Sequence, residues 1–195
     1  MTLVVEDGAG RADAQSYVSL DDAAAYATAQ GLSAWQADGV TDAARDSALI
    51  RATAFIDATY RARFSGYPSR GRAQALEWPR RGAFTYVPDD GRSAAYFDTN
   101  TGAAYDQGYT YLPVNEIPRE LRAAVCEAAV RELAKPGSLA PDLKRGGAIK
   151  SAGAGSARVE FFGNAPAGTT FQTIDLALGP LLMPRSQYSG RAVRG

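Results

Sequence analysis

DAARDSALIRATAFIDATYRARF, residues 42–64, carries the clearest helical pattern in this chain. Its core-facing residues recur with the 3.6-residue period of an α-helix, which gathers them on one face. They are Ala48, Leu49, Ala52, Phe55, Ile56, Thr59 and Tyr60. Thr41 stands where an N-cap belongs, and the arginines of the stretch fall off the apolar stripe. The stretch therefore predicts an amphipathic helix that packs against other helices.

Three further stretches predict helices around this one. Residues 16–31 combine Ser19 as an N-cap, acids in the first turn and Gly31 as the residue after the last turn. Residues 118–135 begin with a proline, which is favoured in the first turn of a helix. Residues 173–182, TIDLALGPLL, predict a last short helix that closes the core. The expected fold is mainly α, a small bundle of three to four helices.

The remaining segments predict short strands and loops. A β-hairpin is expected near residues 93–111, where AAYFD can pair with AAYDQGYTYL, within a loop insertion over 83–111. Further on, AIKS and ARVEFF alternate like two strands and predict an extended β-hairpin arm over residues 146–162. The single predicted domain covers residues 1–182. A flexible basic tail over residues 183–195 follows it and is expected to be disordered in the free protein.

The composition argues against catalysis. The 195 residues include no histidine, which is the commonest metal ligand and the side chain whose pKa lies nearest neutrality, and one cysteine, Cys126. We therefore expect no enzymatic activity, no metal and no cofactor. The glycine-rich GGAIKSAGAG, residues 146–155, lacks the GxxxxGK[ST] order of a phosphate-binding loop. Cys126 stands among apolar helix residues and is expected to fill space in the core.

Neither a membrane segment nor a signal peptide is expected. No apolar run reaches the roughly 18–20 residues that span a bilayer. The first residues, MTLVVEDGAG, have no basic region and turn acidic at once. A single cysteine is compatible with assembly in a reducing cytosol.

Charge alternates along the chain although the net charge is zero. Residues 1–43 are acidic, 44–82 are rich in arginine, 83–116 are acidic again, and 117–195 are basic. Two interpretations stay open at this point. The blocks cancel within one fold, or oppositely charged faces meet across repeated subunit contacts.

The segment ALEWPRRG, residues 75–82, can be interpreted as a reaction centre, a nucleic-acid site or a docking element. Arginines interleaved with aromatic residues are typical of surfaces that bind single-stranded nucleic acid. The aromatic residues in this block are Tyr60, Phe64, Tyr67 and Trp78, and most of them fall at predicted core positions. A neutral chain with a pI near 6.3 is also not the electrostatic signature of an independent nucleic-acid binder.

Five stretches in a fixed order resemble a known family. They are SYVSLDDAAAY, ALIRATAFIDATY, ALEWPR, IPRELRAAVCEAA, and DLKRGGAIKS with the VEF that follows it. This order resembles the head–tail connector (adaptor) proteins of long-tailed bacteriophages. A related group of phage proteins is often labelled DnaT-like single-stranded DNA-binding protein. The resemblance covers nearly the whole chain except roughly residues 83–111, and it depends on the ordered set, because none of the motifs is diagnostic alone.

The resemblance implies a structural virion protein without an active site. Many copies, typically in a twelvefold arrangement, would form a ring beneath the portal at the head–tail interface of the virion, after assembly in the host cytoplasm. The ring would continue the DNA channel and contact a downstream head-completion, stopper or tail protein. Its partners would be other copies of the chain, the portal protein and genomic double-stranded DNA held loosely in the lumen, with no membrane.

The resemblance also implies roles for three sets of residues. Arg80 and Arg81 would project outward, beyond a Trp78 anchored in the core, and contact acids of a neighbouring subunit such as Asp21 and Asp22. In the alternative interpretation both arginines are merely solvated. The arm would line the DNA channel with Lys144, Arg145, Lys150 and Arg158. The tail would dock on the portal through Arg185, Tyr188, Arg191, Val193 and Arg194.

The alternative function is that of a single-stranded DNA-binding replication accessory protein. Such a protein binds oligonucleotides on its own, with an affinity that depends on salt. A connector would instead bind oligonucleotides weakly and associate with the portal.

Overall fold

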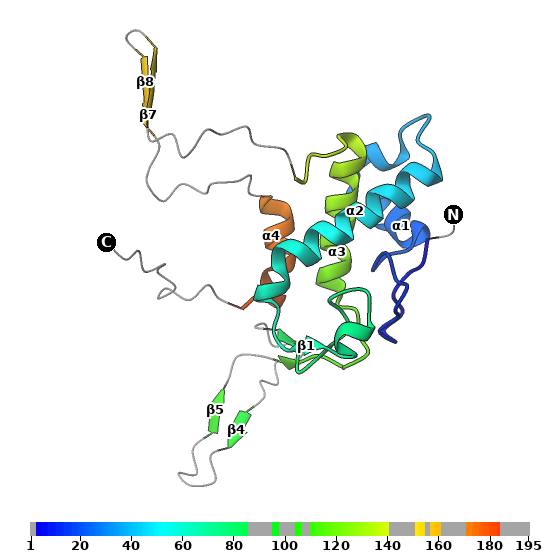
Figure 1. The fold of residues 1–195 in the computed structure, drawn as a ribbon, viewed down its shortest axis with the longest axis vertical. Helices are drawn as coiled ribbons and strands as arrows, with labels where there is room; N and C mark the ends of the chain where they lie inside the picture. Colours follow the sequence, from blue (N-terminus) through cyan, green and yellow to red (C-terminus); the bar gives the residue numbers. More distant parts are fainter. Residues whose placement is uncertain are drawn as a thin grey trace.

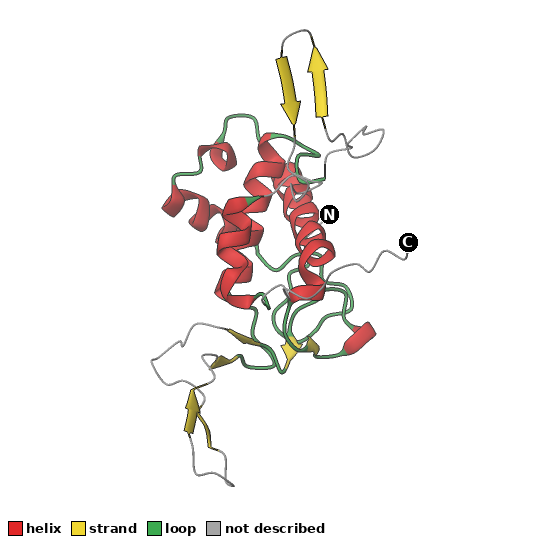
Figure 2. Cartoon of the chain, turned by 90° about the vertical axis from the view of Figure 1, so that its left-hand side faces the viewer, coloured by secondary structure: helices red, strands yellow, loops and turns green. Residues whose placement is uncertain are grey.

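The computed structural model describes residues 3–85, 95–97, 104–106, 110–140, 151–154, 157–160 and 171–183. Among these residues four α-helices dominate, and short strands and turns connect them (Figures 1 and 2). The helices are α1 (Leu20–Gln30), α2 (Asp42–Tyr60), α3 (Arg119–Ala134) and α4 (Gln172–Leu178). The prediction of a mainly α fold with a β-hairpin is confirmed.

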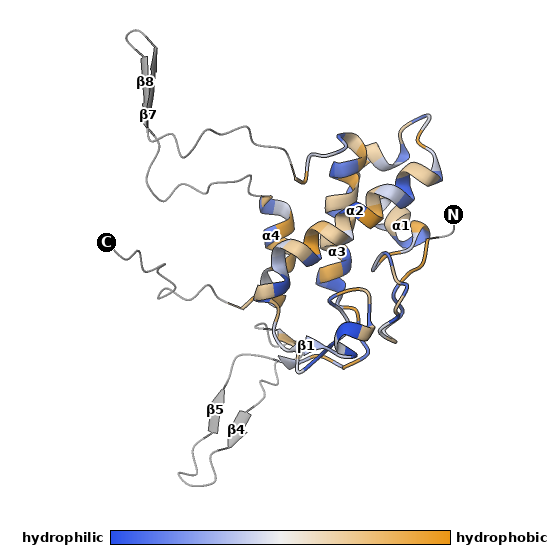
Figure 3. Ribbon diagram, in the orientation of Figure 1, coloured by the Kyte–Doolittle hydropathy of each residue, from blue (hydrophilic) through white to orange (hydrophobic). Residues whose placement is uncertain are grey.

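The helices α2 and α3 form the centre of the fold, and their mutual contact is the most extensive in it. Both helices carry fully buried alanines, and small side chains let helix backbones approach closely. Larger apolar side chains fill the space toward the other helices, and Figure 3 shows apolar residues along the inner sides of the bundle. On the helices they include Leu49, Ile56, Leu121, Val125, Ile174 and Leu178.

Capping residues set the helix starts as the sequence predicts. The Ser19 hydroxyl accepts a hydrogen bond from the Asp22 amide at 3.1 Å, and the Thr41 hydroxyl accepts one from the Ala44 amide at 3.2 Å. Gly31 ends α1 in the left-handed conformation with φ of 67°. The last helix is shorter than predicted, because α4 gives way at Gly179 to a 3₁₀ turn, Gly179–Leu181, that contains Pro180. A proline lacks the amide hydrogen that would continue the helix.

The strands are two to four residues long and pair in antiparallel ladders. One ladder joins β1 (Tyr67–Pro68) to β2 (Arg80–Arg81), and another joins β3 (Phe84–Thr85) to β6 (Thr110–Tyr111). The pairing of β4 (Ala95–Phe97) with β5 (Ala104–Asp106) confirms the hairpin predicted near residues 93–111.

A hairpin also forms within the predicted arm, with one strand displaced from its expected place. The strand β7 (Ser151–Ala154) pairs with β8 (Ala157–Glu160), from Ser151 opposite Glu160 to Ala154 opposite Ala157. The first strand was predicted over AIKS, residues 148–151, and it begins where that stretch ends.

Three short 3₁₀ turns complete the fold: η1 (Ser33–Gln36), η2 (Arg61–Arg63) and η3 (Gly71–Ala73). Trp35 in η1 is buried, with 2% of its surface exposed. Residues 184–195 of the predicted tail and residues 146–150, 155–156 and 161–162 of the predicted arm lie outside the described residues.

Candidate nucleic-acid interface

Trp78 fixes the ALEWPRRG segment to the core. Its side chain is fully buried, and its ring meets the Phe64 ring edge to face at a centroid distance of 5.6 Å. Its backbone amide donates a hydrogen bond to the Tyr17 hydroxyl at 3.0 Å. The predicted anchoring role of Trp78 is therefore confirmed.

Asp57 of α2 holds the same segment from the helix side. Its carboxylate accepts hydrogen bonds from the Tyr17 hydroxyl at 2.7 Å and from the Glu77 amide at 3.0 Å. Burial raises the pKa of Asp57 to about 6, although these two hydrogen bonds and the charge of Arg80 act in the opposite direction.

Arg80 does not project outward, so that prediction is wrong. The side chain is only 5% exposed and forms a salt bridge with Glu77 at 2.9 Å. Its guanidinium also donates to the carbonyl oxygens of Ser65 at 2.9 Å and Gly66 at 2.7 Å. Arg80 lies opposite Pro68 in the β1–β2 ladder, on its inner side. The carbonyl oxygens of Ser65 and Gly66 and the Glu77 carboxylate lie on this side and accept hydrogen bonds from the guanidinium. A contact of Arg80 with another subunit is excluded by this burial.

Arg81, the next residue, points the other way, since successive side chains of a strand alternate between its two sides. It is exposed and lies opposite Tyr67 in the ladder, so the two side chains share the outer side. Tyr67 is 59% exposed. Of the four aromatic residues that the sequence places in this block, Tyr60, Phe64 and Trp78 are buried as predicted, and Tyr67 is the exception.

Two further exposed arginines follow Tyr67 along the chain, Arg70 and Arg72. No ion pair joins Arg70, Arg72 or Arg81 to a carboxylate of the described residues. Figure 3 shows strongly hydrophilic segments at this end of the molecule, beside β1. We call Tyr67, Arg70, Arg72, Arg81 and the nearby Tyr111 the arginine–tyrosine surface.

The loop that carries Arg70 and Arg72 is held in place by the buried side-chain amide of Gln74. Its Oε1 accepts from the Arg70 amide at 2.9 Å, and its Nε2 donates to the carbonyl oxygens of Leu76 at 2.7 Å and Pro79 at 3.1 Å. The stem of Arg70 packs over Gly10, where a Cβ atom would lie 2.8 Å from the Arg70 Cδ. The arginines of the surface therefore project from an ordered backbone.

Tyr111 continues the surface along the neighbouring ladder. It is 59% exposed, lies opposite Phe84, and packs against the Phe84 ring edge to face at 6.1 Å. The Leu112 amide donates to the Ala83 carbonyl oxygen at 2.9 Å, which ties this ladder to the chain just after Arg81. The two exposed tyrosines thus flank the chain segment 80–85.

The other predicted site residues are not brought into this surface. Asp21 and Asp22 are exposed in the first turn of α1, and their predicted contact with another subunit stays a prediction. The side chain of Arg158, which lies in β8, is outside the described part, as are the remaining predicted channel and portal residues. These are Lys144, Arg145, Lys150, Arg185, Tyr188, Arg191, Val193 and Arg194.

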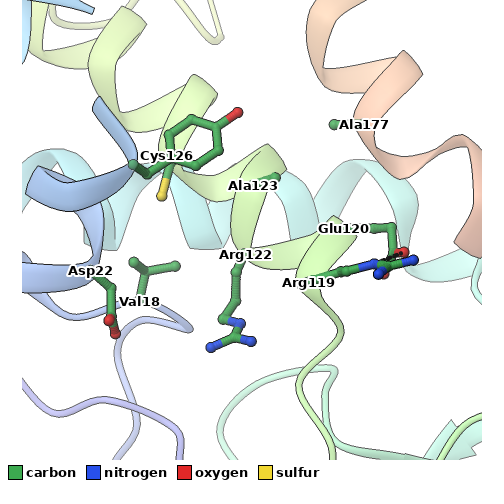
Figure 4. A pocket seen from close by; sticks show the side chains of 9 residues that line it. Val18, Asp22, Arg119, Glu120, Arg122, Ala123, Cys126 and Ala177 are labelled. Carbon is green, nitrogen blue, oxygen red and sulfur yellow. Dashed lines mark hydrogen bonds and ion pairs between the residues drawn. The ribbon is translucent and has the colours of Figure 1, made fainter. Parts of the chain in front are cut away.

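A groove of about 480 Å³ lies between α1 and α3 (Figure 4). Val18 and Asp22 line one side, and Arg119, Glu120 and Arg122 line the other (Figure 4). The charges in it are mixed, and Arg119 is already paired with Glu120 at 3.0 Å. A groove with carboxylates in its wall is a poor site for a polyanion.

Cys126 lies in the wall of this groove, and its predicted burial is confirmed by an exposed fraction of 3%. Burial raises the pKa of its thiol to about 12. Because the thiolate is the reactive form, we expect the folded protein to resist iodoacetamide at pH 8 and to react once it is unfolded in urea. Mass spectrometry of the alkylated protein measures this, and equal rates with and without urea would contradict it.

The described residues contain no group of three or more histidine, cysteine, aspartate and glutamate side chains placed to hold a metal ion. Within the same part of the chain, no helix has the length and apolar character needed to cross a membrane.

A family model described as "Putative DnaT-like ssDNA binding protein" matches residues 1–91 and 102–195. The chain belongs to this family. The unmatched residues 92–101 fall within the predicted insertion over 83–111. No curated protein and no solved structure matches the chain.

The family match overturns the prediction of a phage head–tail connector. The family is described by single-stranded DNA binding, and nothing in the comparisons indicates a connector, a portal partner or a ring. In the described part of the chain, the stretches that carried the resemblance contain many helix-capping, buried and hydrogen-bonded residues, such as Ser19, Leu49, Trp78 and Arg80. Residues of these kinds indicate a fold and do not indicate an assembly. The coarser prediction of a contact with DNA is compatible with the family.

Proposed function

We propose that this protein binds single-stranded DNA through the arginine–tyrosine surface and catalyses no reaction. One observation carries the proposal: within residues 67–81, exposed Tyr67 lies opposite exposed Arg81 in the ladder, and Arg70 and Arg72 in the same segment are exposed too, with no carboxylate partner for any of the three arginines among the described residues. Arginines that are not neutralised by neighbouring acids are available to phosphates, and the exposed ring of Tyr67 is available to a base. Membership of the DnaT-like family supports the same function.

The neutral net charge does not oppose this proposal, because charge is distributed unevenly. Residues 61–85 contain six arginines and one acid, Glu77. Glu77 is engaged by Arg61 at 3.1 Å and by Arg80, so it does not neutralise the exposed arginines. A local positive surface attracts phosphates at distances within a Debye length, whatever the charge on the far side of the protein.

Simultaneous replacement of Arg70, Arg72 and Arg81 by alanine is expected to weaken binding of a fluorescein-labelled oligo-dT on the order of 100-fold at 0.1 M salt. Each phosphate contact on a single strand contributes about 0.7 to the slope of log affinity against log salt, so the slope should fall by about 2. Fluorescence anisotropy over a range of salt concentrations measures both quantities.

The control variant replaces three exposed basic residues of the α3 region by alanine: Arg119, Arg122 and Lys135. It changes the net charge by the same amount and should leave the slope unchanged. If both variants lost the same affinity for oligo-dT, the effect would be one of overall charge. If the unmodified protein bound no oligonucleotide, the proposal would be refuted.

A further inference from the structure

Tyr67 stands on a constrained piece of backbone. Pro68 follows it, and the residue before a proline is restricted to extended conformations. Gly66 precedes it with φ of 66°, and a Cβ atom there would overlap the Arg81 carbonyl oxygen. From the inner side, the Arg80 guanidinium binds the Gly66 carbonyl oxygen at 2.7 Å. The ring is therefore presented at a defined position.

The ring and a positive charge stand side by side. Tyr67 and Arg81 are directly opposite in the β1–β2 ladder, where side chains on the same side of the sheet lie close together. Each nucleotide of a single strand likewise offers a base face and a phosphate joined by one sugar. A base on the Tyr67 ring would bring its phosphate within reach of Arg81.

We infer that Tyr67 is a base-stacking residue and gives the arginine–tyrosine surface its preference for single-stranded over duplex DNA. This inference rests on the proposed function and deepens it. In a duplex each base is covered by its neighbours in the stack, so a protein ring gains access only at a cost, whereas the phosphates of both forms are accessible. The arginines therefore contribute affinity for both single-stranded and duplex DNA, and Tyr67 contributes additional affinity for single-stranded DNA alone.

Tyr67→Ala is expected to lower affinity for oligo-dT about 5- to 100-fold, the range found for the loss of one stacked base, and to leave affinity for a duplex of equal length unchanged. Tyr67→Phe keeps the ring and should bind as the unmodified protein does. Leu176→Ala removes an apolar side chain that is 71% exposed on α4, and it should change neither affinity. Urea denaturation of each variant checks that the fold is retained.

A second readout reports stacking directly. An oligonucleotide that contains 2-aminopurine should lose fluorescence on binding the unmodified protein and Tyr67→Phe, and it should lose less on binding Tyr67→Ala, with all three compared at saturation. This readout separates a stacked base from a phosphate contact.

The outcomes distinguish the inference from the function on which it rests. Tight binding of oligo-dT that Tyr67→Ala leaves unchanged would overturn the inference and leave the proposed function intact. Competition by polyglutamate as effective as that by oligo-dT would also overturn it, since an acidic peptide has no base to stack. If the unmodified protein bound no oligonucleotide, the proposed function would fail and the inference with it.

Discussion

Arg80→Ala is expected to lower the free energy of unfolding by about 3–5 kcal/mol, as the removal of one partner from a buried ion pair does. The substitution leaves the Glu77 carboxylate with only the exposed Arg61 as an ion-pair partner, and it leaves the Ser65 and Gly66 carbonyl oxygens without the Arg80 donor. Lysine in its place cannot form the planar fork that reaches these oxygens together, so Arg80→Lys should recover only part of the loss. Urea denaturation followed by circular dichroism measures these differences.

Arg81→Ala is the matched comparison, because it removes the same side chain one residue further on. Arg81 is exposed and belongs to no ion pair among the described residues, so its replacement should change the free energy of unfolding by less than about 0.5 kcal/mol. The two adjacent arginines are thus expected to differ several-fold in their effect on stability. Similar losses in both variants would contradict the inward orientation of Arg80.

The second large effect concerns pH. Burial raises the pKa of Asp57 from the ordinary value of 3.8 to about 6, so the folded protein holds a proton that the unfolded chain has released between these values. The free energy of unfolding should therefore fall by about 3 kcal/mol from this group alone as pH rises from about 3 to about 7, with about 2 kcal/mol of this fall between pH 4 and pH 6. The groups that face Asp57 are the Tyr17 hydroxyl, the Glu77 amide and carboxylate, and Arg80.

Asp57→Asn removes this titration. Between pH 4 and pH 7 the unmodified protein should lose about 2–3 kcal/mol more of its free energy of unfolding than the variant does. Urea denaturation at pH 4, 5, 6 and 7 on both proteins measures the difference. A constant difference across this range would show that Asp57 does not titrate there. The comparison uses the slope with pH because the asparagine amide also changes the hydrogen bonds to Tyr17 and Glu77 at every pH.

The sequence predicted the fold correctly and the assembly, a connector ring, incorrectly. The ordered stretches SYVSLDDAAAY, ALIRATAFIDATY and ALEWPR lie at α1, α2 and the Trp78 segment, where they cap helices and fill the core. Such residues are shared by proteins that fold alike. The surface that would distinguish a ring subunit from a DNA-binding protein is built from other residues, among them Tyr67, Arg70 and Arg72.

The sequence by itself determined the helices, because their signals are local. The 3.6-residue period over residues 42–64, the caps Ser19 and Thr41 and the glycine at 31 act within one or two turns of chain. The β4–β5 hairpin was predicted from nearby alternation and turn residues for the same reason.

Only the tertiary structure decided which side of the chain Arg80, Arg81 and Tyr67 face. Arg80 and Arg81 are chemically identical neighbours, and the sequence offers no local signal that one is buried and the other exposed. Arg80 is buried and Arg81 is exposed because the β1–β2 ladder aligns Arg80 with Pro68. This alignment brings the Arg80 guanidinium to the carbonyl oxygens of Ser65 and Gly66, about fifteen residues away in the chain. The same pairing turns Tyr67 outward beside Arg81. Burial at these positions is a property of the pairing, which periodicity within a single segment does not encode.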